Sequence, residues 1–567
     1  MQKKTSLTLE TGLILIGLAA LNFFVSGRYV FWVAAWIAPV LALRLLHSHG
    51  VKRGLWLVFW GTYVTTSIAW YGATPIWGLA HFIFMLVNIG IGLLPFLIDR
   101  LLLPRLRQPD GSMPFVATLI FPAATTAFEF VLSSTNPIGN FGALGYSQAA
   151  LPVLVQSTAL FGMLGLTFLL SWFASIVHWL WTYNRPIPFT HPGVIGYGFL
   201  LGAVIMYGAI RLYSAPDATG TLPMLVQTLM LFGMLGLTFL LSWFANITKW
   251  LIPALHPGVV GYGLLLGAVI SYGTVRLYSA PAAAETLTIA SFTLEEVHVP
   301  DYVELMNSDL PTFRAKTAVL HQRYLNETAK AAAEGAQLVL WPESAGIGIS
   351  DDVDLLIEKG QALAQQEGIY LGLPYLRLFP DSEQVAENKL LVIEPNGNIG
   401  IEHVKYGGNL LEGTLAGNGT IQTLDTPFGR IAGIICWDTD FPETVRQVGE
   451  KGVDILLSPS NEWAGIDPMH AEMARFRAVE NGVTLVRQAD KGLSAVFDPY
   501  GRLLAQERGG THHLAANITI SGVATYYATN IKEVVGIMAI GILLTVAAYA
   551  LSRKQYLTPA PEFAMGD

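Results

Sequence analysis

Cys436, Glu343 and Lys405 form a set of side chains that is sufficient for acyl transfer through a thioester. Cys436 is the only cysteine of the chain, and it lies in the apolar run GRIAGIICWD (429–438). A free thiol has a pKa of about 8.5, so it needs a neighbouring base to react at neutral pH. Glu343 is a carboxylate that can take the thiol proton, and Lys405 is an ammonium that can stabilise thiolate and oxyanion charge. Taken singly, each residue also has a common structural interpretation, as a core thiol, a turn carboxylate or a solvated lysine.

A predicted β-strand precedes each of these residues. Glu343 ends AQLVLWPE (336–343), and Lys405 ends the second of two strands around a Pro-Asn-Gly turn (388–405). The alternation of strand and helix signals predicts an α/β domain with a central sheet, in which active residues cluster at strand ends. Further strands are expected at 287–294, 454–460 and 483–489, and helices at 312–334 and 467–481.

The charged residues are distributed unevenly along the chain. Of 567 residues, 52% are hydrophobic and 13% are charged, against about 25% charged in soluble proteins. We expect a transmembrane domain (1–283), a water-facing catalytic domain (284–530) and a C-terminal transmembrane helix with a tail (531–567). A span needs about 20 mostly apolar residues. The runs of that kind lie near 9–26, 29–47, 54–72, 77–98, 114–133, 152–182, 193–212, 223–252, 258–278 and 533–552.

Positive charges set the expected orientation of these spans. With the N-terminus in the cytoplasm, twelve Lys and Arg residues fall on the cytoplasmic side and three on the other side, as the positive-inside rule favours. Nine spans precede the catalytic domain, so we expect that domain to face outward and the tail to return to the cytoplasm. The cytoplasmic set is Lys3, Lys4, Arg44, Lys52, Arg53, Arg100, Arg105, Arg107, Arg185, Lys249, Arg553 and Lys554, and the other set is Arg28, Arg211 and Arg276.

A two-helix hairpin is duplicated in tandem, at 151–216 and 222–281, and residues 160–174 recur without change at 231–245. The close identity indicates a recent duplication or an error in assembling the sequence. Two added helices preserve the side on which the catalytic domain lies. Glu129 is a carboxylate inside an expected span, which favours a functional role and equally a buried carboxylate bonded to a neighbouring helix.

Three motifs in sequence order resemble the nitrilase, or carbon–nitrogen hydrolase, superfamily: WPES (341–344), HVKYGGNLLEG (403–413) and ICWDTDFPETVR (435–446). The resemblance covers roughly residues 287–510. It implies a four-layer α-β-β-α sandwich and a Glu-Lys-Cys triad of Glu343 as base, Lys405 as stabiliser and Cys436 as nucleophile. Residues expected to support the triad are Glu412, which matches the family's second glutamate, Trp437, Asp438, Glu443 and Trp463.

One branch of that superfamily joins several spans, a nitrilase domain and a final span, and the chain resembles it: the apolipoprotein N-acyltransferases. The similar segments are 136–156, 460–465, 470–482 and 490–502. The resemblance implies that a phospholipid acylates Cys436 and that a diacylated lipoprotein accepts the acyl group. It also implies a bacterial inner-membrane enzyme, expected as a monomer without a cofactor.

The chain departs from this branch at several positions. The run after Lys405 is YGGNLLEGTLAGNG (406–419), Trp437 and Asp438 replace Tyr-Glu, and an arginine expected after Glu129 is missing. These departures leave two other readings open, a membrane-anchored amidase and a non-enzymatic transporter or receptor. With a net charge of −8 and no basic tract, nucleic acid is excluded as a partner. No metal is expected, and His470, on a predicted helix, is interpreted as structural.

Overall fold

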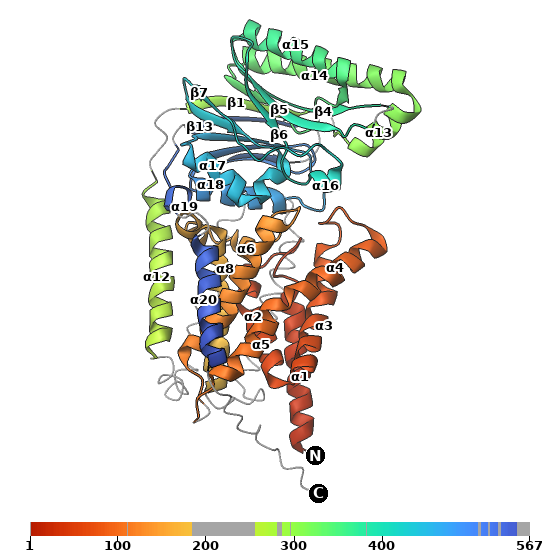
Figure 1. Ribbon diagram of the computed structural model, residues 1–567. Coiled ribbons are helices and arrows are strands. Elements are labelled where there is room, and N and C mark those ends of the chain that lie inside the picture. The colour runs from red at the N-terminus through yellow and green to blue at the C-terminus, as the bar shows by residue number, and fades with distance from the viewer. Residues whose placement is uncertain are drawn as a thin grey trace, which may run out of the picture.

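The computed structural model describes residues 2–109, 112–183, 256–280, 286–294, 296–380, 383–508, 512–519, 522–530 and 534–552. In these residues a helical bundle carries an α/β domain stacked on one of its ends (Figure 1). The expected spans at 193–212 and 223–252 lie outside the described residues. The structure therefore shows the first hairpin copy up to residue 183 and the second copy from residue 256.

The bundle has the composition of a membrane protein. Many large apolar side chains on its surface are exposed, among them Leu79, Leu264 and Leu544, which suits contact with lipid rather than water. Five of its helical segments are long and apolar enough to cross a membrane: Gly78–Leu106, Phe115–Thr135, Thr158–Thr182, Pro257–Tyr278 and Val534–Ser552. Its helices are α1 (Gln2–Asn22), α2 (Trp32–Ser48), α3 (Val51–Trp70), α4 (Gly78–Gly92), α5 (Leu94–Leu106), α6 (Ile120–Thr135), α7 (Pro152–Val155), α8 (Thr158–Tyr183), α12 (Pro257–Tyr278) and α20 (Val534–Ser552).

The expected span at 152–182 is divided in the structure. The short helix α7 precedes α8, and Gly162 inside α8 has a left-handed φ of +64°. A Cβ atom on Gly162 would lie 2.4 Å from the ring of Tyr527, so only glycine fits there. Tyr527 belongs to α19 (Tyr526–Asn530), which contacts α8 directly.

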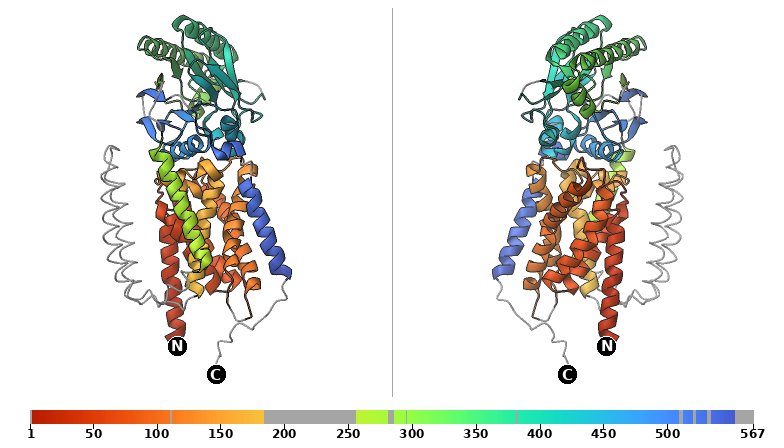
Figure 2. Two further views of the ribbon diagram at one scale, coloured as in Figure 1. Left: turned by 90° about the vertical axis from the view of Figure 1, so that its left-hand side faces the viewer. Right: turned by 90° about the vertical axis from the view of Figure 1, so that its right-hand side faces the viewer.

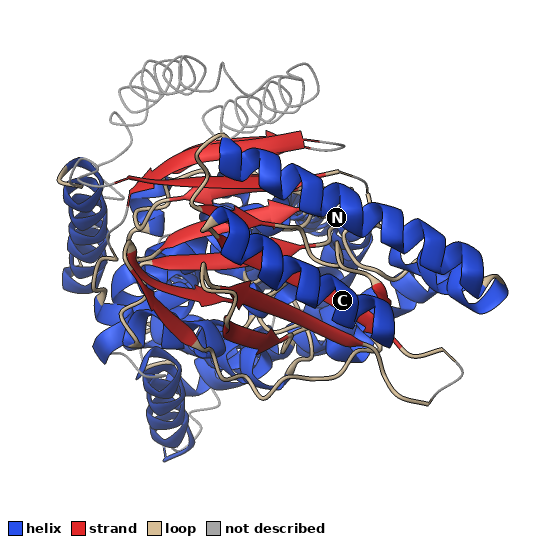
Figure 3. Cartoon of the chain, turned by 90° about the horizontal axis from the view of Figure 1, so that it is seen from above, coloured by secondary structure: helices blue, strands red, loops and turns tan. Residues whose placement is uncertain are grey.

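Two β-sheets form the inner layers of the α/β domain (Figures 1 and 3). The first has seven strands in the order β13-β1-β2-β4-β5-β6, with β3 paired to β4, and the second has six in the order β12-β11-β10-β9-β8-β7. The first sheet comprises β1 (Thr286–Thr293), β2 (Leu338–Leu340), β3 (Gly348–Ile349), β4 (Tyr370–Leu378), β5 (Glu387–Ile393), β6 (Ile399–Val404) and β13 (His512–Thr519). The second comprises β7 (Thr423–Thr426), β8 (Gly429–Gly433), β9 (Ile455–Ser460), β10 (Thr484–Ala489), β11 (Leu493–Phe497) and β12 (Leu503–Arg508).

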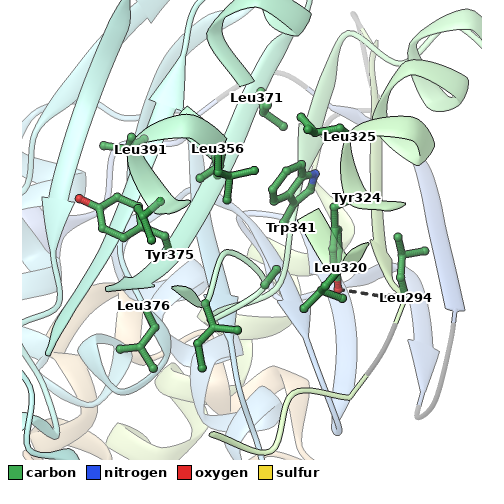
Figure 4. Close-up of a cluster of buried hydrophobic side chains, with 14 of the residues drawn as sticks. Leu294, Leu320, Tyr324, Leu325, Trp341, Leu356, Leu371, Tyr375, Leu376 and Leu391 are labelled. Atoms are coloured by element: carbon green, nitrogen blue, oxygen red, sulfur yellow. Dashed lines mark hydrogen bonds between the residues drawn. The ribbon is translucent and has the colours of Figure 1, made fainter. Parts of the chain in front are cut away.

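Helices cover the outer face of each sheet, and three apolar cores join the four layers. The core between the sheets includes Leu338, Ile455 and Val486. A second core packs Trp341 and Tyr324 under the outer helices (Figure 4), and a third lies between the second sheet and its helices. The expected four-layer α-β-β-α sandwich is confirmed. The covering helices are α13 (Val299–Ser308), α14 (Leu310–Ala333) and α15 (Ser350–Glu367) on the first sheet, and α17 (Pro442–Glu450) and α18 (Met469–Asn481) on the second.

Helix α18 packs on both sides. Its small residues, such as Ala474, face the core of the second sheet. Its larger residues Met473 and Phe476 face a core that they share with Leu166 and other residues of the bundle. Figure 2 shows the α/β domain seated on the end of the bundle in two further views. Because one helix contributes to both cores, the two regions form one packed unit.

Candidate active site

Lys405 is the centre of a buried ion cluster. Its backbone follows β6, and its side chain is completely buried. Nζ lies 2.8 Å from Oε1 of Glu343 and 2.6 and 2.7 Å from the two carboxylate oxygens of Glu412. Burial lowers the pKa of Lys405, but the charges of Glu343 and Glu412 outweigh it and hold the pKa well above its ordinary value. The lysine is therefore a permanent cation between two carboxylates.

Glu343 is fixed by donors from both sheets. The fully buried Trp341 anchors the turn that carries it, donating a hydrogen bond of 2.9 Å from Nε1 to Thr328. Asn388 on β5 donates to Oε1 of Glu343 at 2.7 Å, and the backbone N–H of Asn461 donates to Oε2 at 2.7 Å. Only 3% of Glu343 is exposed, so these contacts define one position for the carboxylate.

Cys436 occupies a sharp turn after β8. Its φ is +46°, a left-handed value that a residue other than glycine rarely adopts, and the turn begins the short helix Cys436–Asp440. Such a turn presents a nucleophile at the end of a strand. The thiol is buried, with Sγ 4.0 Å from the carbonyl oxygen of Asn461.

Burial, and then the charge of Glu343, raise the pKa of the Cys436 thiol, while Lys405 and His470 oppose that rise. The net direction is upward, so the resting residue is a neutral thiol. Glu343 is a buried carboxylate whose charge acts on this thiol. This arrangement suits Glu343 as a general base that removes the Cys436 thiol proton while the sulfur attacks a carbonyl carbon.

Asp438 joins the loop after Lys405 to the turn of Cys436. Its Oδ1 accepts the backbone N–H groups of Tyr406 (2.8 Å) and Gly407 (2.7 Å). Its Oδ2 accepts the N–H of Ile435 at 2.8 Å and lies 2.6 Å from Nε2 of His403. The side chain therefore positions both loops.

Aromatic side chains separate the site from the bundle. The ring of Trp437 lies 6.1 Å from that of Trp463 and 6.2 Å from that of Phe141, which belongs to the bundle. Trp463 donates from Nε1 to the carbonyl of Gly72 at 2.7 Å. Gly408 has a φ of +78°, and a Cβ there would meet the Trp437 ring at 2.0 Å, so the loop after Lys405 lies directly on this tryptophan.

Glu129 and Glu443 lie apart from the triad. Glu129 accepts the backbone N–H of Leu144 at 2.9 Å and the hydroxyl of Thr167 at 2.7 Å, which ties the loop of 136–148 to α8. Glu443 pairs with Arg446 on α17. Both carboxylates line a cavity of about 350 Å³ at the end of the bundle that meets the α/β domain. Of the two interpretations of Glu129 from the sequence, the contacts match the buried carboxylate that is hydrogen-bonded to a neighbouring helix.

Apolar side chains are exposed on the loop that follows Lys405. Leu410 is 79%, Leu411 47% and Leu415 41% exposed. Leu410 and Leu411 lie on α16 (Asn409–Glu412), together with Glu412 of the ion cluster. Figure 1 places α16 at the edge of the α/β domain that faces the bundle. An exposed apolar group beside a polar site marks a surface for an apolar ligand or membrane.

Several residues near the site were missed in the sequence. Asn388 and Asn461 position Glu343, and neither has a local pattern that would reveal this role. His470, which the sequence predicts to be structural, lies in a completely buried charged cluster behind the cysteine. The other members of that cluster are Asp440, Glu462 and Arg487. Among the described residues, no group of three His, Cys, Asp or Glu side chains could hold a metal ion.

Both halves of the chain match models of known protein families. Residues 306–527 match the carbon–nitrogen hydrolase family, and residues 17–176 match the apolipoprotein N-acyltransferase N-terminal domain. An apolipoprotein N-acyltransferase of Agrobacterium fabrum is 27% identical over 321 residues, and one of Geobacter metallireducens is 28% identical over 320. Each match covers 50% of this chain and spans 58% of the length of the relative.

A solved amidase from Nesterenkonia sp. is 18% identical, with a TM-score of 0.34, and the match covers 46% of this chain and 97% of the amidase. The two family matches lie on the two regions that the structure stacks together, the helical bundle and the α/β sandwich. The chain therefore contains a carbon–nitrogen hydrolase domain at 306–527, preceded at 17–176 by a domain of the apolipoprotein N-acyltransferase N-terminal type.

Proposed function

We propose that the chain transfers a fatty acyl group from a phospholipid, through a thioester on Cys436, to the N-terminal amine of a diacylated lipoprotein. One observation carries the proposal. The buried cluster of Lys405, Glu343 and Glu412 lies beside a loop whose leucines are exposed at the bundle-facing edge. A site for small soluble amides needs no such apolar border, whereas a lipid donor does.

The first half of the reaction acylates the sulfur. As Sγ of Cys436 attacks the ester carbonyl of the phospholipid, its proton passes to Glu343. The Lys405 ammonium stabilises the oxyanion that develops. When the intermediate collapses, the ester C–O bond breaks, and the departing lysophospholipid oxygen takes the proton from Glu343.

The second half returns the enzyme to its starting state. The acceptor amine, in its neutral form, attacks the thioester carbonyl and gives a proton to Glu343. The C–S bond breaks, and the sulfur leaves as a thiolate beside Lys405. Glu343 then returns the proton to Cys436, so that protons and charges balance over the cycle.

The proposed setting is the bacterial cytoplasmic membrane, with 284–530 on the extracytoplasmic side between membrane domains at 1–283 and 531–567. The distribution of Lys and Arg residues supports this orientation. Both substrates are lipids, so a site seated on the end of the bundle meets them at the bilayer surface.

The test is the intact mass of the purified protein after incubation with phospholipid in detergent, for the wild type and Cys436→Ala. We expect a fatty-acyl gain that hydroxylamine removes and that the variant lacks. A diacylated lipopeptide should then discharge the thioester and become triacylated. Release of free fatty acid with no lipopeptide product would instead identify a hydrolase, and acylation of the variant would contradict the assignment of Cys436.

A further inference from the structure

Asp490 connects the loop that follows β1 of the first sheet to the second sheet. It comes directly after β10, and its side chain is completely buried. Its Oδ2 accepts the backbone N–H of Val297 at 2.8 Å, and its own backbone N–H donates to the carbonyl of Ser460 at 3.0 Å. Val297 lies in the loop after β1, and Ser460 ends β9. Asp490 has no role in the reaction described above, although it holds segments of both sheets together.

The chain of hydrogen bonds continues from Val297 to the triad. The carbonyl of Val297 accepts a hydrogen bond of 3.0 Å from Nδ2 of Asn461 and one of 3.3 Å from Nζ of Lys491. The backbone N–H of the same Asn461 donates to Oε2 of Glu343 at 2.7 Å, and its carbonyl oxygen lies 4.0 Å from Sγ of Cys436. The side chain of Asn461 therefore anchors the peptide segment that contacts both the base and the nucleophile.

The bond from Val297 to Asp490 does not require a charge on the carboxyl. Burial raises the pKa of Asp490 to about 7, although the charge of Lys491 and the N–H of Val297 oppose that rise. Among the described residues, Oδ1 of Asp490 has no hydrogen-bond partner. Oδ2 can therefore accept the N–H of Val297 whether or not the carboxyl carries a proton. An asparagine would supply the same acceptor, and its NH2 group would replace Oδ1 without displacing a donor.

We propose that Asp490 is a positioning residue that sets the distance between Glu343 and Cys436, because it holds Val297 and, through Val297, the side chain of Asn461. This inference rests on the proposed function for the roles of the base and the nucleophile. Without the Asp490 carboxyl, the buried N–H of Val297 has no acceptor, which is costly, so the loop after β1 shifts. Asn461 then loses its fixed acceptor, and misplacing a reacting group by about 1 Å costs about 10²-fold in rate.

The experiment follows the acetylation of Cys436 by p-nitrophenyl acetate in the full chain in detergent. The sulfur attacks the ester carbonyl, its proton passes to Glu343, the ester C–O bond breaks, and p-nitrophenolate leaves without needing a proton. Absorbance records the phenolate, and intact mass records the acetyl group that hydroxylamine removes, with Cys436→Ala as the background. For Asp490→Ala we expect the second-order rate constant of acetylation to fall about tenfold or more.

Three further variants make the result specific. Asp490→Asn keeps the acceptor for Val297, so its acetylation rate should stay close to that of the wild type. Asn461→Ala keeps the backbone N–H but loses the side-chain anchor, so its rate should fall by a factor similar to that of Asp490→Ala. Both losses act through the same Val297 peptide. The double variant should therefore be no slower than the slower of the two single variants.

Asp454→Ala is the matched control. The carboxylate of Asp454 also accepts two backbone N–H groups, from Arg430 at 2.8 Å and from Gly522 at 2.7 Å. Asp454 comes directly before β9, whereas Asn461 comes directly after it, so the two residues lie at opposite ends of the strand. Asp454→Ala should lower the thermal unfolding temperature and leave the acetylation rate unchanged.

A wild-type acetylation rate in folded Asp490→Ala would overturn the inference. Equal losses in Asp490→Asn and Asp490→Ala would also overturn it, and so would losses that multiply in the double variant. If Asp490→Ala lacks a cooperative thermal unfolding transition, Asn461→Ala becomes the deciding variant, and a wild-type rate there would contradict the proposed chain of contacts.

The probe separates this inference from the proposed function. p-Nitrophenyl acetate replaces the phospholipid as acyl donor, and its reaction with Cys436 needs no lipoprotein. The acetylation rates therefore stay informative if phospholipid fails to acylate the protein, and the two proposals fail separately.

Discussion

The backbone N–H of Asn461 donates a hydrogen bond of 2.7 Å to Oε2 of Glu343, although the two residues follow strands of different sheets. The carbonyl oxygen of Asn461 lies 4.0 Å from the Cys436 sulfur. One peptide segment therefore contacts both the proposed base and the proposed nucleophile. The distance between them depends on how the two sheets pack rather than on either loop alone.

Glu343→Gln should abolish most of the acyl transfer and also lower the stability, because it removes a negative charge beside the buried Lys405 and turns an amide NH2 toward the backbone N–H of Asn461. The amide keeps an oxygen for Asn388 and Lys405 but cannot take the thiol proton, and removing a general base costs about 10²–10⁴ in rate. The measurement is the rate of lipopeptide acylation. Glu358→Gln, at an exposed position on α15, is the matched control and should keep wild-type activity. Similar activity in both variants would exclude Glu343 as the base.

Lys405→Met should destabilise the fold as well as stop the reaction. It leaves Glu343 and Glu412 facing each other without the cation that now lies between them. Breaking a buried pair by removing one partner costs about 3–5 kcal/mol, measurable by denaturant unfolding in detergent. Adding Glu412→Gln should recover part of the loss, because one unpaired charge disappears. No recovery in this double variant would contradict the ion-cluster account.

Asp438 should make stability depend on pH in acid. Burial raises the pKa of the Asp438 carboxyl, but His403 and the N–H groups of Ile435 and Gly407 outweigh it and lower the pKa overall. Its contribution is therefore present above the unfolded pKa of about 4 and is lost as the pH falls through the folded pKa.

Unfolding of the wild type and Asp438→Asn, compared between pH 7 and pH 3, tests this assignment. The stability difference between the two proteins should be largest at neutral pH and shrink in acid, because Asn does not titrate. A difference that stays constant over this range would show that the carboxylate charge of Asp438 contributes nothing.

Leu411→Asn should weaken the use of lipid substrates without changing the chemistry. Burying a leucine in an apolar environment is worth about 1.5–3 kcal/mol, so we expect KM for phospholipid in mixed micelles to rise about tenfold. Alkylation of Cys436 should be unchanged. Leu503→Asn is the matched control, since Leu503 is 46% exposed against 47% for Leu411 but lies on β12. An equal rise of KM in Leu411→Asn and Leu503→Asn would show that the loop after Lys405 does not bind the lipid.

The α/β class of the domain and the strand-end positions of the triad could be predicted because their signals are local, whereas the four-layer arrangement was implied by the family resemblance. Glu343, Lys405 and Cys436 each follow a run of apolar residues that forms a strand, and the structure brings the three strand ends together. Strand alternation and the polar residue that follows each strand are both visible within about ten residues of sequence.

The surroundings of the triad could not be predicted in the same way. His470 meets partners from three other segments of the chain, and only tertiary packing brings them together. Asn388 and Asn461 act through a single side-chain amide and a single backbone N–H. The break of α8 at Gly162 depends on the ring of Tyr527, more than 300 positions away in the sequence.

Helix α18 has its small residues in one core and its large residues in another. Tilting the α/β domain would pull this helix out of one of them, exposing Phe476 or Ala474 to water. The height of the Cys436 sulfur above the end of the bundle is therefore fixed by close packing. Under the proposed function, the lipid substrates have to bring their ester and amine groups to that level, so the enzyme would select substrates by how far the headgroup reaches.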